Sequence, residues 1–287
     1  MGSASLAVNL PPGTYDVHVS VDNYSGDYVV VVLSTIDSND LTKVYKSSDA
    51  FYARFFDSNG NYLSNGSNVS FSVNGVSYTR HVSGDDGLAK FNINLPVGDY
   101  VISIVNPVTG ESKSNVIHII PPIVNNHDLV KYYKNGSDFT VQIIDSSFNP
   151  VSGGVVVFTI NGVSYSRQTD SMGWAKFSIN LLPGDYVITT SYGGCDVSNN
   201  VLVLPVLYAN DLVVSYGSKS RFEAKVVDGQ GNPYPNQVVT FNINGVSYNR
   251  ASDNNGVAGL NINLPAGEYI INSEYMGYNT VNKVIVR

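Results

Sequence analysis

Apolar and polar residues alternate one by one along most of this chain. Residues 89–95 read Ala-Lys-Phe-Asn-Ile-Asn-Leu, and the same register returns at 175–181 and 258–264. A period of two residues puts the apolar side chains on one face of a strand and the polar ones on the other. Antiparallel sheets that pack one face on a core and expose the other to water show this pattern. The alternation therefore predicts an all-β protein.

Short motifs recur along the chain at a regular interval. The pentapeptide Asn-Gly-Val-Ser-Tyr begins at Asn74, Asn161 and Asn244, and a segment close to Asn-Leu-Pro-x-Gly-Asp-Tyr follows it each time. An Asn-Gly pair between alternating runs is a strong signal for a tight hairpin, because both central residues must accept a positive φ. A recurrence at about 85 residues predicts tandem repeats. The predicted repeats 1, 2 and 3 are residues 35–122, 123–206 and 207–287.

Residues 1–34 match only the last third of a repeat. Asn9-Leu10-Pro11 is followed by Gly13-Thr14-Tyr15, as in the complete copies, and strands are expected near 14–22 and 27–34. An apolar face on so few strands has no second sheet to cover it. We therefore expect this segment, the C-terminal part of a truncated repeat, to be the least ordered region or to be completed by repeat 1 or a neighbouring molecule.

The second repeat has the strand content of a β-sandwich. Seven short strands in about 85 residues, with frequent turn signals, are typical of an immunoglobulin-like build. The disulfide of antibody domains is excluded, because Cys195 is the one cysteine of the chain. Trp174 precedes the buried position 175 and is expected to cover the outer face of its strand. The seven strands are predicted at 128–133, 138–145, 154–161, 162–169, 174–180, 185–192 and 198–204.

Composition narrows the choice of partners. Of 287 residues only 14% are charged, the formal net charge is −7, and the pI is near 4.9. Nucleic acid is not expected as a partner, because phosphate binding needs a concentrated basic face. No apolar run approaches the length of about 18 residues that a membrane-spanning helix needs. The first four residues, Met-Gly-Ser-Ala, show no signal-peptide pattern.

Side chains suited to catalysis do not converge in the repeats. Cys195 is interpreted as a small buried residue, and Asp85 with Asp86 as a solvated turn rather than a calcium loop. We predict no enzyme activity, no catalytic residue, no metal site and no cofactor. The pentapeptide tyrosines share a strand face with a valine and are predicted to lie in the core: Tyr78, Tyr165 and Tyr248. The histidines lie far apart and lack metal-ligand spacing: His18, His81, His118 and His127.

Three motifs together resemble bacterial Ig-like repeats of surface adhesins. They are Asp-x-x-Gly-Asn-Pro with a later Val-x-Phe (228–241), Thr-Asp-x-x-Gly-x-Ala-x-Phe (169–177) and Leu-Pro-x-Gly-x-Tyr (95–100). The run Asp-Leu-Val-Lys-Tyr-Tyr-Lys-Asn-Gly-Ser (128–137) is also similar to adhesin-like cell-surface proteins of methanogenic archaea. The resemblance implies tandem Ig-like antiparallel β-sandwiches in an extracellular, cell-surface stalk or adhesin without enzyme activity.

The resemblance leaves the binding partner open. It implies attachment to a polysaccharide or protein on the surface of another cell. Two alternatives stand beside this interpretation: an array of carbohydrate-binding modules attached to a secreted enzyme, and a subunit of a structural filament. Exposed aromatic clusters at the same place in each repeat would favour the carbohydrate-binding alternative.

Surface Ig-like domains of adhesins and pili, the class that the repeats resemble, can join a lysine of the first strand to an asparagine of the last by an amide bond. The matching pairs here are Lys43 with Asn115 and Lys131 with Asn199. Repeat 3 has Val214 where the lysine would stand. The amine must be neutral to attack, so the site must lower the lysine pKa. The alternative is an exposed strand-edge lysine that discourages aggregation.

Asn-x-Ser sequons mark candidate N-glycosylation sites. If the chain is exposed on a cell surface, the expected turn and strand-edge positions leave space for a glycan. The candidate acceptors are Asn23, Asn65, Asn68 and Asn135.

Overall fold

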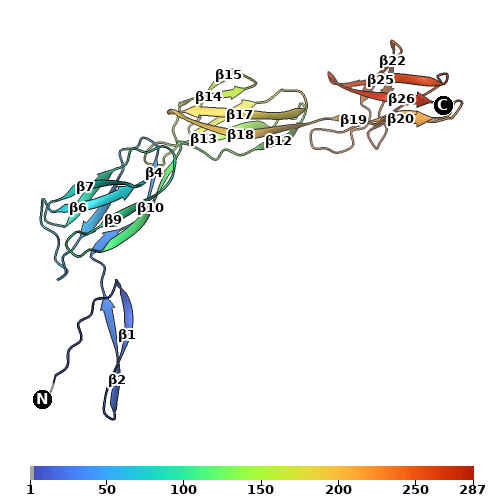
Figure 1. The fold of residues 1–287 in the computed structure, drawn as a ribbon. Coiled ribbons are helices and arrows are strands. Elements are labelled where there is room, and N and C mark those ends of the chain that lie inside the picture. Colours follow the sequence, from blue (N-terminus) through green and yellow to red (C-terminus); the bar gives the residue numbers. More distant parts are fainter. Residues whose placement is uncertain (1–2) are drawn as a thin grey trace. The chain divides into compact units, whose positions relative to one another are not determined.

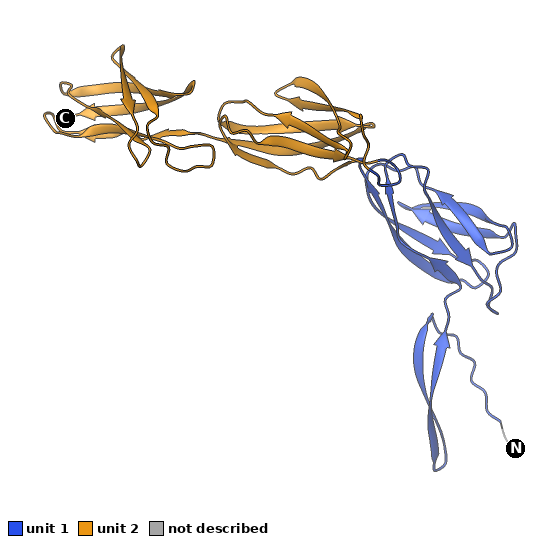
Figure 2. Ribbon diagram, turned by 180° about the vertical axis from the view of Figure 1, so that it is seen from behind, with its two compact units in different colours: residues 1–122, 145–149 blue, residues 123–144, 150–287 orange. Residues whose placement is uncertain are grey.

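A computed structural model describes residues 3–287, which form 26 β-strands. The chain divides into two compact units, residues 1–122 with 145–149 and residues 123–144 with 150–287 (Figure 2). None of the described residues lies in a helix that is long and apolar enough to cross a membrane. The all-β tandem sandwich predicted from the alternation is confirmed.

Repeat 1 is a sandwich whose first strand is divided between two layers. One layer holds β3 (Ile36–Ser38), β5 (Ala50–Phe55) and β8 (Leu88–Asn92), paired antiparallel in that order. The other layer, seen side by side in Figure 1, has the order β4-β10-β9-β6-β7. Its strands are β4 (Leu41–Val44), β10 (Ser112–Ile120), β9 (Gly98–Val105), β6 (Asn68–Val73) and β7 (Val76–Ser83). The end of β7 also pairs with β8 and joins the two layers.

The core of repeat 1 consists of the alternating apolar residues. Phe51 and Phe55 of β5 meet Phe71 of β6 edge to face, with ring centroids 6.2 and 6.1 Å apart. Ile102 and Ile104 of β9 pack in the same buried cluster. Burial of a large apolar side chain contributes about 1.5–3 kcal/mol, so each inward-facing residue of these strands stabilises the sandwich.

Repeat 2 has the same two layers, formed by separate sheets. The seven predicted strands are all present. The structure adds β11, a two-residue strand that is too short to produce a periodic signal. The first sheet is β11 (Ile123–Val124), β13 (Asp138–Ile143) and β16 (Trp174–Ser178). The second is β12 (Leu129–Tyr132), β18 (Cys195–Leu204), β17 (Gly184–Tyr192), β14 (Val155–Ile160) and β15 (Val163–Gln168).

Repeat 3 follows the same plan. The shared features are a parallel first-strand segment beside the last strand and an Asn-Gly hairpin at the far edge. The first sheet is β19 (Leu207–Ala209), β21 (Arg221–Val226) and β24 (Val257–Asn261). The second is β20 (Leu212–Val214), β26 (Tyr278–Val286), β25 (Gly267–Tyr275), β22 (Val238–Ile243) and β23 (Val246–Ala251).

The Asn-Gly turns adopt the predicted geometry. Asn74 has φ 52° and Gly75 has φ 76°, so both central residues of the β6–β7 turn lie in the left-handed region. Glycine adopts that region without strain, and asparagine tolerates it better than most residues. The repeated Asn-Gly pair is therefore explained by the turn itself.

Residues 13–32 form a separate two-stranded sheet. It consists of β1 (Gly13–Val21) and β2 (Tyr24–Val32), antiparallel and in continuous register from Gly13 opposite Val32 to Val21 opposite Tyr24. The strands expected near 14–22 and 27–34 are both found, shifted by one to three residues.

Candidate functional site

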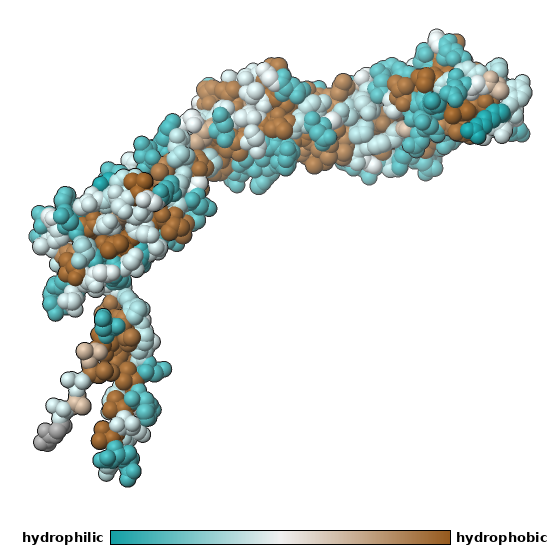
Figure 3. All heavy atoms as spheres, viewed as in Figure 1, coloured by the Kyte–Doolittle hydropathy of each residue, from teal (hydrophilic) through white to brown (hydrophobic). Residues whose placement is uncertain are grey.

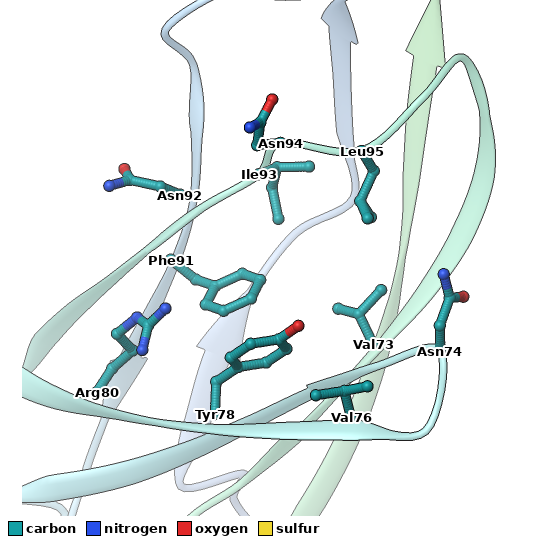
Figure 4. Close-up of a pocket in the computed structure, with 10 residues that line it drawn as sticks. All are labelled: Val73, Asn74, Val76, Tyr78, Arg80, Phe91, Asn92, Ile93, Asn94 and Leu95. Carbon is teal, nitrogen blue, oxygen red and sulfur yellow. The ribbon is translucent and has the colours of Figure 1, made fainter.

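The candidate site is a groove of repeat 1 between the unpaired parts of β7 and β8, which we call the β7–β8 groove. It has a volume of about 350 Å³ and lies between β7, β8 and the chain that follows β8 (Figure 4). Its floor is apolar and its ends carry amides. It is lined by Val73, Asn74, Val76, Tyr78, Arg80, Phe91, Asn92, Ile93, Asn94 and Leu95.

Two aromatic rings and a guanidinium form the centre of the groove. The Tyr78 and Phe91 ring centroids lie 5.2 Å apart with a tilt of 53°. The Arg80 guanidinium lies 5.6 Å from the Tyr78 centroid and 5.0 Å from the Phe91 centroid. Tyr78 is 37% exposed, whereas Phe91 is buried and stacks on Phe71 below it. The result is a fixed apolar platform with a cation beside it.

Repeats 2 and 3 present the same arrangement. Tyr165 lies 4.9 Å from Phe177 between centroids, and the Arg167 guanidinium is 5.4 Å from Phe177. In repeat 3 the guanidinium of Arg250 lies 5.7 Å from the Tyr248 centroid. Leu260 takes the place of the phenylalanine there. The platform therefore recurs with one change from aromatic to aliphatic.

The prediction that the pentapeptide tyrosines lie in the core is wrong. Tyr78 and Tyr165 are exposed by more than a third, and Tyr248 is half-buried. The strands that carry the last two, β15 and β23, are edge strands of their sheets. Each of these two tyrosines therefore packs against a neighbouring strand on one side of its own strand and faces solvent on the other side. Alternation identifies the face of a strand, but not how far the opposite layer extends.

The arginines of the platform were not predicted from the sequence, although the repeated motif contains them. The pentapeptide extends in all three copies to Asn-Gly-Val-Ser-Tyr-x-Arg, which places Arg80, Arg167 and Arg250 two residues after the tyrosine. Residues two apart on a strand lie on the same face. A guanidinium beside an exposed ring could thus have been inferred from the repeats alone.

The lining of the groove consists of apolar side chains, amides and one guanidinium. None of its lining residues is a carboxylate or a histidine. Flat apolar rings with nearby amide donors and acceptors are the side chains that recognise ring-shaped ligands with both apolar faces and hydroxyl edges. No group of three or more histidine, cysteine, aspartate or glutamate side chains among residues 3–287 could hold a metal ion.

Lys43 and Lys131 are buried, so the alternative of an exposed strand-edge lysine is wrong. Their exposed fractions are 2% and 4%. Lys43 Nζ donates to the carbonyl oxygens of Ser47, Asp49 and Ile93 at 2.9, 2.8 and 3.0 Å. Lys131 Nζ donates to Ser137 and Ile179 at 2.9 Å each. Each lysine therefore ties the first-strand segment to the loop that follows it and to the chain after β8 or β16.

Burial lowers the pKa of both lysines, because an ammonium loses hydration in the interior. The nearby carboxylates of Asp49 and Asp138 act in the opposite direction to a smaller extent. Three carbonyl acceptors around Lys43 match the three N–H donors of an ammonium. This environment supports a structural tether.

The structure does not bring Lys43 to Asn115 or Lys131 to Asn199. Lys43 is opposite Ile119 in the β4–β10 ladder, four residues or about 13 Å along the strand from Asn115. Lys131 is opposite Val203, likewise four residues from Asn199. The amide crosslinks therefore stay a prediction. Measurement of the intact mass of the protein tests it, because each bond would release ammonia and lower the mass by about 17 Da.

The recurring asparagines have partners of another kind. Asn115 Nδ2 donates to Asp40 Oδ1 at 3.0 Å, and Asp40 also accepts the Val116 backbone N–H at 2.8 Å. The same aspartate–asparagine pair recurs as Asn199 with Asp128 at 3.5 Å and Asn282 with Asp211 at 3.3 Å. This contact explains why repeat 3 keeps the asparagine although Val214 replaces the lysine.

The four candidate glycosylation acceptors differ in accessibility. Asn23, Asn65 and Asn68 are exposed, at or beside turns. Asn135 is half-buried, and its Oδ1 accepts the backbone N–H and the hydroxyl of Ser137 at 2.7 and 2.6 Å. Of the four, we therefore expect Asn135 to be the poorest acceptor.

Comparisons with known proteins give only distant structural likenesses. No protein-family model and no curated protein matches the chain. The titin I9–I11 tandem is similar at 14% identity, with 88% of this chain and 98% of that chain covered and a TM-score of 0.32. A Ca²⁺-stabilised, ice-binding adhesin of an Antarctic bacterium is similar at 15% identity over 96% and 82%, with a TM-score of 0.23. A Bacteroides ovatus protein, SGBP-B of a mixed-linkage glucan utilization locus, is similar at 12% identity over 87% and 66%, with a TM-score of 0.22. Likenesses with TM-scores this low carry no argument about this chain.

Proposed function

We propose that this chain is a non-enzymatic segment of an extracellular, cell-surface adhesion protein, composed of a partial repeat (1–34) and three Ig-like repeats (35–122, 123–206 and 207–287). The observation that carries the proposal is the tyrosine–arginine platform, which recurs on the second strand of the Asn-Gly hairpin in all three repeats. A purely structural role of the repeats would require no exposed aromatic residue there. Repetition of one weak site on one chain is the arrangement that gains most from multivalent attachment.

The proposed ligand class is polysaccharide on another cell or in a matrix. A pyranose ring can lie on the exposed part of Tyr78 while its hydroxyl groups meet Asn92, Asn94 and the Arg80 guanidinium. A repeating polymer can engage several platforms of one chain. Linked weak sites gain a factor of about 10²–10⁴ over a single site when the geometry lets them bind together.

The experiment measures binding of the purified chain to a glycan array and to whole cells. The test variant is Tyr78→Ala, Tyr165→Ala and Tyr248→Ala combined. The control removes exposed tyrosines elsewhere, Tyr52→Ala with Tyr216→Ala, which leave the platforms intact. We expect the triple variant to lose at least about tenfold in apparent affinity and the control to bind like the parent. Equal binding by the triple variant and the parent would contradict the proposal.

A carbohydrate-binding module array is the second candidate, and the same platform favours it. The two functions separate in the whole-cell arm of the experiment. An adhesion segment retains cells on a surface coated with the chain, whereas a module array binds soluble or insoluble polysaccharide without retaining cells.

A further inference from the structure

We propose that the ligand of the tyrosine–arginine platforms is an acidic polysaccharide. The pyranose ring of a uronic acid residue lies on the tyrosine, and its carboxylate pairs with the arginine. This assignment rests on the proposed function, because it names the chemical class of the polysaccharide that the platforms bind. It is carried by the three arginines that follow the platform tyrosines, which we call the platform arginines: Arg80, Arg167 and Arg250.

The platform arginines share one local geometry. Each Nη1 donates a hydrogen bond to the backbone carbonyl of the preceding residue: Arg80 to Thr79 at 2.9 Å, Arg167 to Ser166 at 2.8 Å and Arg250 to Asn249 at 2.8 Å. Each guanidinium also lies beside an aromatic ring, as Figure 4 shows for Arg80 next to Phe91 and Tyr78. These two contacts order a long side chain before any ligand binds, which lowers the entropic cost of binding.

The shared hydrogen bond leaves the other edge of each guanidinium available. No hydrogen bond joins Nε or Nη2 of a platform arginine to another residue within 3–287. These two nitrogens carry parallel N–H groups, the fork that binds both oxygens of a carboxylate. A sugar hydroxyl uses neither the planar pair of donors nor the positive charge. The available edge therefore fits a carboxylate better than it fits the hydroxyl groups of a neutral sugar. Figure 3 shows the polar and apolar side chains that share the surface of the repeats.

Two other arginines show that guanidinium groups of this chain do pair with its own carboxylates. Arg54 Nη2 lies 3.1 Å from Asp86 Oδ2, and Arg221 Nε lies 2.8 Å from Glu223 Oε1. Among residues 3–287, no carboxylate oxygen lies within 4.0 Å of a platform arginine. The chain nevertheless has 23 acidic residues and a net charge of −7. A cation beside a tyrosine ring without a carboxylate partner, repeated three times, favours a ligand that supplies the negative charge.

A uronic acid fits the platform better than a nucleic acid does. Its carboxylate is bonded directly to the pyranose ring, so a ring that lies on Tyr78 brings the carboxylate to its edge, where Arg80 lies. The amides of Asn92 and Asn94 line the same groove and can meet the ring hydroxyl groups. Phosphate binding needs a concentrated basic face, whereas the groove lining contains a single cation, Arg80.

The first arm of the test changes the ligand and uses the unaltered chain. It measures binding to polygalacturonate and to the same polymer with its carboxyl groups methyl-esterified, which keeps the rings and removes the charge. We expect the free acid to bind at least about tenfold more tightly at low salt, because hydrogen bonds to a charged group contribute more than neutral ones. This preference should disappear in about 1 M salt, where the Debye length is only about 3 Å.

The second arm changes the protein. The test variant combines Arg80→Gln, Arg167→Gln and Arg250→Gln, and we expect it to lose the preference for the free acid while it still binds the ester. The control removes the same charge from exposed lysines outside the platforms, by Lys90→Gln, Lys176→Gln and Lys225→Gln, and should bind both polymers like the parent. The three arginines changed to lysine keep the charge without the fork and should retain only part of the preference.

The outcomes separate the acidic ligand from the proposed function. Equal binding of acid and ester by the parent, lost on Tyr78→Ala with Tyr165→Ala and Tyr248→Ala, would overturn the acidic ligand and leave polysaccharide binding intact. Binding of neither polymer, or of any glycan on the array, would contradict the proposed function and the acidic ligand together. Single-stranded DNA bound as tightly as polygalacturonate, and lost on the three arginine substitutions, would overturn the assignment in favour of a general polyanion site.

Discussion

Hairpins β1–β2 and β9–β10 come from the same sequence pattern and end in different environments. Both begin with a Gly-x-Tyr segment, and their strands are eight or nine residues long. In both, the tyrosine hydroxyl donates to the carbonyl of the residue four positions earlier, Tyr15 to Pro11 and Tyr100 to Pro96, which is the hydrogen bond of a tyrosine corner. Ile102, Ile104 and Ile117 of β9–β10 are fully buried, whereas Val19, Val21 and Tyr28 of β1–β2 are exposed. The comparison teaches that hairpin formation is local, while burial depends on strands from elsewhere in the repeat.

The largest expected effect distinguishes the two hairpins at one equivalent position. Ile104→Asp places a carboxylate in the closed core of repeat 1 and should lower its free energy of unfolding by more than about 4 kcal/mol. Val19→Asp, at the exposed equivalent, should leave the unfolding of all three repeats unchanged. Calorimetry of both variants measures this difference. Deletion of residues 1–34 serves as the control and should also leave the three repeats folded. Unfolding of repeat 1 on deletion would show that the boundary at residue 35 is wrong.

The next effect tests the tether that the first-strand segment provides in a complete repeat. Lys43→Met removes the donor from three buried carbonyl groups and should destabilise repeat 1 by about 1–3 kcal/mol. Lys90→Met, at an exposed lysine, is the control. Chemical denaturation measures both. If the Lys43→Met variant were as stable as the parent, the hydrogen bonds of the lysine would contribute nothing to the free energy of unfolding of repeat 1, and the prediction would be wrong.

Repeat 3 offers the reciprocal substitution. Val214 occupies the position of the buried lysines and is itself buried. Val214→Lys should cost less than about 1.5 kcal/mol, because the carbonyl groups of the same turn can accept its ammonium. Val284→Lys, which has no such turn beside it, should cost more than about 3 kcal/mol. Equal losses at the two positions would show that the carbonyl arrangement is specific to repeats 1 and 2.

A smaller effect concerns the tyrosine corner that both hairpins share. Tyr100→Phe removes a hydrogen bond of 3.0 Å and should lower the stability of repeat 1 by about 1 kcal/mol. Tyr15→Phe removes the same bond from β1–β2 and should not change the stability of any complete repeat. Thermal unfolding of the two variants measures this difference. A larger loss of stability of repeat 1 in Tyr15→Phe than in Tyr100→Phe would contradict this interpretation.

The smallest effect arises from the aspartate that ties the first-strand segment to β10. The backbone N–H of Val116, followed by the amide of Asn115, lowers the pKa of Asp40. A carboxylate with a lowered folded-state pKa stabilises the protein above its unfolded value near 3.9, and this contribution is lost as the pH falls through the folded pKa. We expect the melting temperature of repeat 1 to decrease when the pH is lowered below about 4. Asp40→Asn should reduce that acid dependence, and an unchanged profile would contradict the assignment.

Strand positions were predictable because they depend on neighbours in sequence. The seven strands of repeat 2, the Asn-Gly turns and the hairpin near residues 14–34 all follow from alternation and turn chemistry. The short strand β11 was missed because two residues carry no period. The sequence suggests a crosslink for the buried lysines because it shows their spacing from Asn115 and Asn199. It does not show the carbonyl groups that accept their hydrogen bonds, since those lie on other segments of the repeat.

The sequence by itself determined the repeat, the strands, the turns and the side of each strand that turns inward, because these depend on residue spacing and local φ preferences. Only the tertiary structure decided how much of each inward face is covered. Tyr78 shares its face with core residues yet is 37% exposed, and Val19 shares the pattern of Ile104 yet is 48% exposed. Burial depends on the extent of the opposite layer, which belongs to strands that are distant in sequence. The β7–β8 groove, which we propose as a binding surface, occurs where that layer ends.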